Sequence, residues 1–175
     1  MDHSENFMDS ALFEFKRYKA LGDKTFSQLS SEEILWTLNH GDNSISLIVK
    51  HMVGNMLSRW TNFMTADGEK PWRNREAEFE GPYGSKSEML RAWEQGWQCL
   101  FDALATINSA NFNTLVLIRN EEHTVMEAML RQLAHYANHV GQIVMLGKMI
   151  KGKDWVSLSI PRGGSEAFNK KKFEE

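Results

Sequence analysis

The sequence predicts an all-α protein, a four-helix bundle with long connections and an extended C-terminal tail. Apolar side chains recur at helical spacing over four long stretches, at about residues 5–28, 43–64, 86–108 and 125–150. A serine or threonine followed three residues later by a glutamate, the pattern of an N-terminal capping box, opens three helical segments. An antiparallel bundle buries four such faces, with the long connections as crossovers or lids.

The first half of the chain contains two long predicted helices with a short one between them. The helix at about 5–28 has an apolar face made of Phe7, Ala11, Leu12, Phe15, Tyr18 and Leu21. Ser30 with Glu33 opens the short segment, which breaks near Gly41. The helix at about 43–64 has an apolar face made of Ile45, Ile48, Met52, Met56 and Phe63.

The second half begins with an irregular stretch. Residues 67–84 contain clusters of Gly and Pro and no sustained period, which predicts a long connection of a kind that is often functional or disordered. The β-type run at 114–118 predicts a short strand or extended segment. The two remaining helices begin at capping boxes, Ser85 with Glu88 and Thr124 with Glu127.

The composition is that of one domain, residues 1–175, with a disordered tail at 168–175. A chain of 175 residues with 42% hydrophobic content can bury a sizeable core. Its formal charge of −3 provides no broad basic field for nucleic acid. The sequence contains neither an apolar run long enough to span a bilayer nor the features of a signal peptide. The single Cys99 suits a reducing compartment, so we expect a cytoplasmic protein without a membrane partner.

His135 and His139 are the most informative residues of the chain. Because they are four positions apart on a predicted helix, their imidazoles leave the same face and can grip one divalent metal. That helix is apolar nearly all round, which predicts that it is buried. The alternative is that both are core histidines, hydrogen-bonded to the backbone or to Gln132 and Gln142.

His51, on the second long helix, is the third candidate. Its stripe of the helix consists of small and polar residues, together with two apolar ones: Ser44, Leu47, Ile48, Gly54, Asn55 and Ser58. Small side chains leave room for a metal, its water and a ligand, so His51 could be a metal ligand. The alternative is that His51 is an exposed histidine at the edge of the core face. We expect the other histidines to be exposed: His3, His40 and His123.

One histidine in the second helix and His-x-x-x-His in the last helix of a four-helix bundle resemble the DinB-like superfamily of metal-dependent enzymes. Residues 131–143, Arg-Gln-Leu-Ala-His-Tyr-Ala-Asn-His-Val-Gly-Gln-Ile, look like one bacterial branch of it, catalogued as a domain of unknown function. The tail at 155–165, which contains Ser-Ile-Pro-Arg-Gly, looks like the same branch. The resemblance extends from the first helix to about Phe168.

The resemblance implies a bundle, often dimeric, with zinc, nickel or a similar ion held by three histidines. Carried over by position, the ligands are His51, His135 and His139. Relatives in the superfamily include transferases that join low-molecular-weight thiols to electrophiles, and isomerases that act on thiol adducts. No thiol-binding residues can be carried over, and a fold is shared more widely than a reaction.

Three imidazoles with one open position are the arrangement of a catalytic zinc site. The open position takes either a water, which favours hydrolysis, or a substrate thiol as thiolate, which favours thiol transfer. No Glu or Asp lies within one turn of these histidines on their helix stripes, and the lack of a general base favours thiol transfer. Arg131 either reaches an anionic substrate or is a surface charge. Candidate hydrogen-bond partners of the imidazoles are Gln132, Gln142 and Asn55.

Other catalytic classes fit less well. The Glu-x-x-His pairs of di-iron bundles and the His-Glu-x-x-His motif of metalloproteases are both missing. Cys99 lies among bulky apolar residues, which favours a core thiol over a nucleophile. The tail from Ser157 to Ser165 is extended because Pro161 bars a helix. One interpretation is that this tail packs on the bundle as a strap. The other is that it covers the opening of the metal site or a dimer partner, with Arg162 facing the ligand.

The sequence therefore predicts a metal-dependent enzyme that transfers a low-molecular-weight thiol to an electrophile. The alternatives are a metal-dependent hydrolase and a non-catalytic bundle in which the metal or the bare histidines serve stability or binding. The expected partners are a small-molecule substrate, a divalent metal ion and a second copy of the chain in a homodimer.

Overall fold

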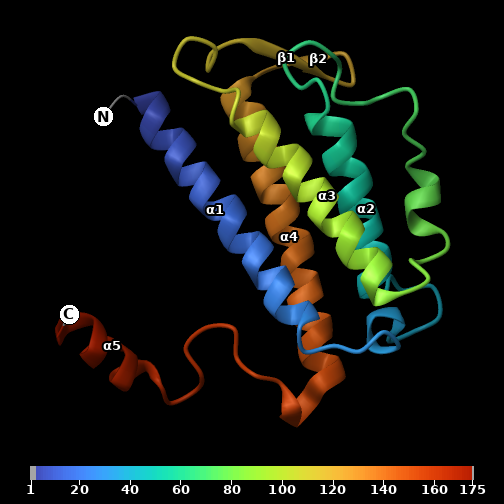
Figure 1. Ribbon diagram of the computed structural model, residues 1–175, viewed down its shortest axis with the longest axis vertical. Coiled ribbons are helices and arrows are strands. Elements are labelled where there is room, and N and C mark those ends of the chain that lie inside the picture. The colour runs from blue at the N-terminus through green and yellow to red at the C-terminus, as the bar shows by residue number, and fades with distance from the viewer. Residues whose placement is uncertain (1–2, 175) are drawn as a thin grey trace.

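The computed structural model describes residues 3–174, and most of them are helical (Figure 1). The long helices α1 (His3–Phe26), α2 (Ile45–Trp60), α3 (Lys86–Leu104) and α4 (Val125–Lys151) lie side by side. Helix α2 packs mainly on α3, α1 packs on α4, and α2 also touches α4. All four long helices predicted from apolar periodicity are present; α3 and α4 begin where expected, and the other ends differ by one to four residues.

The helices do not form the simple antiparallel arrangement expected from the sequence. Helices α2 and α3 run in the same direction, because the connection at 61–85 returns along the full length of α2 before α3 begins (Figure 1). This crossover contains one short helical turn, η2 (Glu76–Phe79), which packs on α2. The Ser58 hydroxyl of α2 binds the first part of the crossover. This hydroxyl donates to the carbonyl of Gly68 at 2.8 Å and accepts from the Lys70 amide at 3.1 Å.

The helix starts follow the capping signals in the sequence. Thr124 and Glu127 form a complete capping box at the start of α4, and Ser85 accepts from the Glu88 amide at 3.2 Å at the start of α3. Ser44 caps α2, which begins two residues later than expected. Ser30 and Glu33 exchange both capping hydrogen bonds, although the helix they open is only the 3₁₀ turn η1 (Glu33–Leu35).

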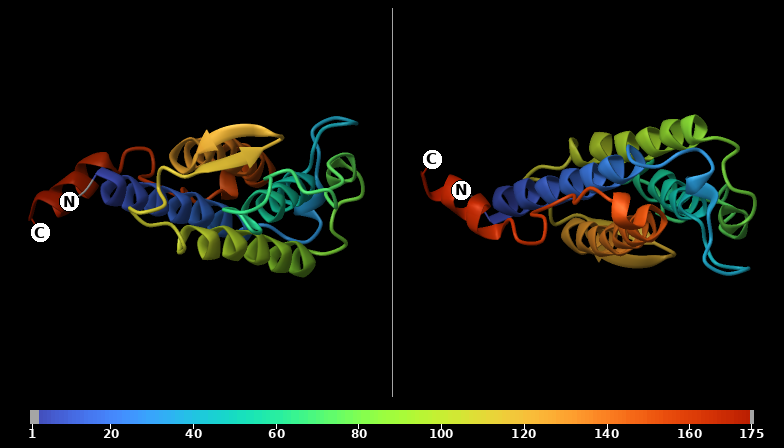
Figure 2. Two further views of the ribbon diagram at one scale, coloured as in Figure 1. Left: turned by 90° about the horizontal axis from the view of Figure 1, so that it is seen from above. Right: turned by 90° about the horizontal axis from the view of Figure 1, so that it is seen from below.

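A two-stranded hairpin precedes α4 and crosses one end of the molecule (Figure 2). Strand β1 (Leu115–Ile118) pairs in antiparallel fashion with β2 (Glu121–Thr124). Its two-residue turn places Arg119 and Asn120 at φ values of 56° and 62°, the left-handed region that such turns require. The Asp67 carboxylate accepts from both of these amides, at 2.9 and 2.7 Å, and thereby ties the hairpin to the crossover.

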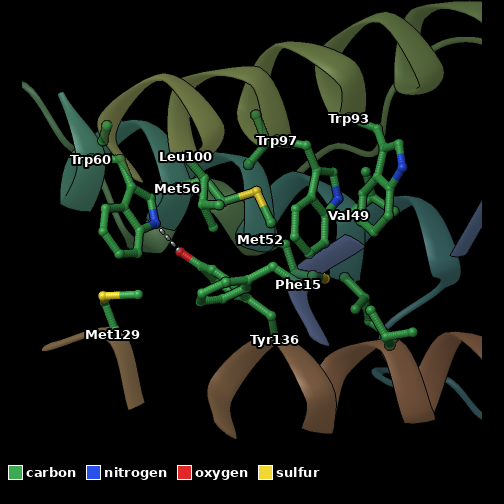
Figure 3. Packing of buried hydrophobic residues seen from close by; sticks show 14 of the residues in the cluster. Phe15, Val49, Met52, Met56, Trp60, Trp93, Trp97, Leu100, Met129 and Tyr136 are labelled. Atoms are coloured by element: carbon green, nitrogen blue, oxygen red, sulfur yellow. Dashed lines mark hydrogen bonds between the residues drawn. The ribbon is translucent and has the colours of Figure 1, made fainter. Parts of the chain in front are cut away.

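The core lies between the four helices and is rich in aromatic side chains (Figure 3). Phe15 meets Trp60 and Trp97 edge to face, with ring centroids 6.4 and 6.5 Å apart. Two linked hydrogen bonds cross this core. Trp60 Nε1 donates to the Tyr136 hydroxyl at 3.1 Å, and that hydroxyl donates to Asn55 Oδ1 at 3.0 Å. This polar chain joins α2 to α4 directly beside the histidine-bearing turns.

The tail leaves α4 through η3 (Gly152–Asp154) and folds back on the helices as an irregular segment. Trp155 and Leu158 line a groove between α1 and α4, and Gln28 exchanges two hydrogen bonds with the backbone of Val156. These contacts fit the strap interpretation. The expected disordered end contains helix α5 (Ser165–Glu174), which stands apart from the other helices with every residue exposed (Figure 1).

Within residues 3–174, none of the helices combines the length and the apolar character that a membrane span requires.

Candidate metal centre

The structure brings His51 of α2 together with His135 and His139 of α4. The Nε2 atom of His135 lies 3.3 Å from that of His51 and 3.0 Å from that of His139. The ligand atoms of all three residues lie within 4.8 Å of one another, so the cluster could hold a metal ion. His51 is buried, and the other two histidines are half-buried.

Local geometry and helix packing both contribute to this convergence. His135 and His139 are neighbours because one helical turn separates them, and their ring centroids are 4.7 Å apart. His51 reaches them because α2 lies beside α4, and its ring meets that of His139 edge to face at 4.9 Å. Phe79 of the crossover stacks on the ring of His51, with the centroids 4.8 Å apart, and limits rotation of the ring.

The outer nitrogens of two histidines are held by hydrogen-bond acceptors. His51 Nδ1 lies 2.8 Å from Glu78 Oε2, and His139 Nδ1 lies 3.0 Å from Gln142 Oε1. Both oxygens accept, so each Nδ1 carries the hydrogen and each Nε2 presents a lone pair. As neutral imidazoles, His51 and His139 therefore both direct an Nε2 lone pair toward Nε2 of His135, which is an arrangement that a bound cation stabilises.

Glu78 is fixed on both sides. Arg73 donates to it twice, from Nε to Oε1 at 2.7 Å and from Nη2 to Oε2 at 3.0 Å. Burial opposes ionisation of Glu78, but the hydrogen bonds from His51 and Arg73 outweigh burial and lower its pKa. Arg73, Glu78 and His51 thus form one continuous chain from the crossover to the cluster.

His135 and His139 are held in their neutral form. Burial, followed by the proximity of His139 and His51, lowers the pKa of His135 to about 3. Burial also lowers the pKa of His139, against the hydrogen bond to Gln142. Neutral imidazoles have the free lone pair that a metal requires.

The donor set fits a divalent transition metal such as zinc. Two nitrogens bound to one tetrahedral zinc at about 2.0–2.1 Å lie roughly 3.3 Å apart. The two short Nε2 separations in the cluster, 3.3 and 3.0 Å, are close to that value. Three imidazoles leave one coordination position free, as in catalytic rather than structural zinc sites.

Of the three expected hydrogen-bond partners of the imidazoles, the structure places one against a histidine of the cluster. Gln142 contacts His139 as predicted. Asn55 instead accepts from Tyr136, and Gln132 is buried with its Oε1 atom unpartnered in the described part of the chain. His3 and His40 are exposed as expected, whereas His123 is half-buried in β2.

Glu78 and Arg73 are the functional residues that sequence reasoning missed. No Glu or Asp lies within one turn of the histidines on their own helix stripes, but the crossover supplies a carboxylate from a distant part of the sequence. The sequence feature that could have indicated this contact is Gly54, one turn from His51. A β-carbon at this position would come within 2.7 Å of the Glu78 carboxyl carbon. The space around His51 therefore admits a carboxylate, where the sequence suggested room for a metal and its ligand.

Cys99 plays no part in the histidine cluster. It is half-buried on α3, with its Sγ atom 3.6 Å from the Thr61 hydroxyl. It lines a separate cavity of about 770 Å³ between α2 and α3, to which none of the three clustered histidines contributes.

Comparison with known proteins places the chain in a family without naming a reaction. No curated protein matches the chain. Residues 2–164 match the model of a family described as "Protein of unknown function (DUF1572)". This match covers most of the chain, including the whole histidine cluster, and it agrees with the expected branch of unknown function. The chain therefore belongs to the DUF1572 family of proteins of unknown function.

Proposed function

We propose that the protein is a metal-dependent enzyme in which His51, His135 and His139 bind one divalent ion, zinc or nickel. The observation that carries the proposal is the convergence of three Nε2 atoms, with the outer nitrogens of His51 and His139 held by acceptors. Nε2 of His135 faces the Nε2 atoms of both His51 and His139 and can donate a hydrogen to only one of them, so without an ion at least one pair of lone pairs repels in the neutral cluster. Bound metal removes that repulsion and accounts for the Glu78–Arg73 pair behind His51.

The reaction that we propose is the transfer of a low-molecular-weight thiol to an electrophile. A divalent metal with an open position lowers the pKa of a thiol that it binds. The sulfur then forms a bond to the electrophilic carbon, the leaving group departs with its bonding electrons, and the thiol proton passes to solvent. Hydrolysis would need a free general base, whereas both oxygens of Glu78 are engaged by Arg73 and His51.

The arrangement of the helices supports membership of the DinB-like superfamily as part of the proposal. Four long helices with a crossover between the second and third present one histidine from α2 and two from α4. We propose one such domain for the chain, associated as a homodimer. Exposed apolar side chains along α4 support the homodimer: Met126, Leu130, Met145 and Met149.

Metal analysis of the untagged protein tests the first step. We expect about one zinc or nickel ion per chain in the wild type and loss of that metal in His51→Ala, His135→Ala and His139→Ala. His40→Ala is the matched control, since His40 is exposed and outside the cluster. Far-UV circular dichroism establishes that each variant is folded. Substoichiometric metal in the folded wild type refutes the proposal.

A second assay separates the reaction classes. The metal-loaded protein is incubated with several low-molecular-weight thiols and an aryl chloride electrophile, and thioether and chloride are measured together. We expect thioether formation that requires thiol, is lost on chelation and returns with metal. Chloride release without any thioether product assigns a hydrolase instead. Metal without either activity assigns a non-catalytic bundle.

A further inference from the structure

A polar cavity of about 250 Å³ opens directly beside the histidine cluster. We name it the arginine cavity. Its walls consist of His51, Asn55, Arg59, Arg73, Arg75, Arg119, Arg131, Gln132 and His135. Five of these nine residues are arginines, and among the described residues that line the cavity none is acidic.

The arginines come from four separate parts of the chain. Arg59 lies on α2, Arg73 and Arg75 on the crossover, Arg119 in the hairpin turn and Arg131 on α4. Helix packing, the crossover and the hairpin must all be in place before these guanidinium groups meet. They concentrate positive charge in a protein whose formal net charge is −3.

The carboxylates nearby only partly offset this charge. Glu69 is shared, since its Oε2 atom lies 3.2 Å from nitrogens of Arg59, Arg73 and Arg119. Glu78 pairs with Arg73, and Glu76 meets Arg75 at the surface, 3.5 Å away. Three carboxylates thus face five guanidinium groups. Asp67 also lies near, but its oxygens accept from backbone amides, and Lys70 offsets its charge.

Two buried polar atoms on the wall residues have no partner within residues 3–174. They are Nε of Arg59 and Oε1 of Gln132, and the two residues are 5% and 3% exposed. A buried N–H donor without an acceptor is unfavourable. An oxyanion in the cavity would supply an acceptor for Arg59, and guanidinium groups bind carboxylate and phosphate oxygens in pairs.

We propose that the arginine cavity binds the oxyanion group of a small substrate, a carboxylate or a phosphoryl group, and presents the rest of that molecule to the histidines. His51 and His135 line the same cavity, so an anion held by Arg59 and Arg131 has its other end beside their Nε2 atoms. The volume of about 250 Å³ is roughly eight times the 30 Å³ that a water occupies in the liquid, which suits a small molecule.

The orientation of the substrate rests on the proposed function, because the histidines are taken as its reacting end. Oxyanion binding itself is measured without turnover. The cavity is lined by His51 and His135 but not by His139. A His139→Ala variant therefore removes a proposed metal ligand and leaves the walls of the cavity intact. This separates an anion held by arginines from one held by a metal.

The test is calorimetric titration of the full-length protein with inorganic phosphate and, separately, with succinate. Arg131→Gln and Arg75→Gln alter exposed residues, and Arg91→Gln on α3 is the exposed control outside the cavity. We expect saturable binding of at least one anion in the wild type, in Arg91→Gln and in His139→Ala. Affinity should fall about tenfold in each of the two cavity variants, as expected for one lost charged hydrogen bond.

Three results would overturn the inference. The first is no saturable binding of either anion at millimolar concentration. The second is equal affinity in the wild type and in both cavity variants, with folding established by circular dichroism. The third is binding that is lost in His139→Ala and kept in the cavity variants, which places the anion on the metal. That result leaves the proposed function standing. Conversely, a wild type that binds the anion but contains substoichiometric metal supports the cavity and refutes the metal-dependent function.

Discussion

Gly54 of α2 lies against the carboxylate of Glu78. A β-carbon at position 54 would come within 2.7 Å of the Glu78 carboxyl carbon, and the helix can approach the crossover this closely only because the side chain is absent. The same carboxylate accepts from His51 Nδ1 at 2.8 Å, one turn of α2 away from Gly54. A residue without a side chain therefore decides how one histidine of the cluster is oriented.

Replacing Gly54 with alanine should displace Glu78 and release the ring of His51. We expect the affinity for zinc to fall about 10–100-fold, the usual consequence of losing a hydrogen-bonded partner of a metal-binding histidine. Competition with a chromophoric chelator measures the affinity. Gly141→Ala is the matched control, because Gly141 lies on α4 near the cluster with open space at its Cβ position. Equal zinc affinity in both variants would show that Glu78 does not orient His51.

Gln142 should act on His139 as an acceptor. In Gln142→Ala the His139 Nδ1 hydrogen loses the oxygen that lies 3.0 Å away, and we expect roughly tenfold weaker zinc binding. Gln142→Glu keeps an acceptor at the same place and should retain the affinity. The same chelator competition applies. A similar loss in both variants would contradict a role for the hydrogen bond.

Tyr136→Phe tests the polar chain in the core separately from the metal. The change leaves Trp60 Nε1 and Asn55 Oδ1 without the hydroxyl that joins them, in a fully buried position. We expect the free energy of unfolding to fall by about 1–3 kcal/mol, with metal content unchanged. Urea denaturation gives the first quantity. Tyr18→Phe is the control and should cost less than about 0.5 kcal/mol, because Tyr18 is partly exposed and its hydroxyl accepts a hydrogen bond from Arg17, which is itself exposed.

Lowering the pH should reduce the free energy of unfolding, because Glu69 becomes protonated. Burial opposes ionisation of Glu69, but the charges of Arg73 and Arg59 outweigh it and lower its pKa below the ordinary 4.5. The unfolded chain then binds the proton more readily. The stabilisation is therefore complete above pH 4.5 and is lost as the pH falls through the lower folded-state pKa.

Glu69→Gln should remove this contribution. At neutral pH we expect the variant to lose about 2 kcal/mol, because Arg59 is left buried with one acceptor fewer. Below about pH 4.5 the difference in the free energy of unfolding between variant and wild type should decrease, by up to about 1.4 kcal/mol per pH unit. Urea denaturation at a series of pH values measures the difference. A difference that stays constant on acidification would contradict the assignment.

Local patterns predicted much of the fold correctly. Apolar periodicity located the four long helices, and the capping boxes located the start of α3 and α4. The second strand of the hairpin was missed, because its residues Glu121–Thr124 have no β-type pattern and its turn residues, Arg119 and Asn120, are not the usual Asn-Gly pair. The common direction of α2 and α3 was also missed, since it depends on the path of the crossover.

The sequence by itself determined the helices and the placement of His135 and His139 on one face, because both follow from the period of the backbone within a single element. Only the tertiary structure decided that Glu78 and Arg73 lie behind His51, and that Arg119 lines one cavity with His51 and His135. These residues come from a crossover and a turn that carry no helical period. Their positions depend on packing between segments distant in the chain, including the space that Gly54 leaves open on α2.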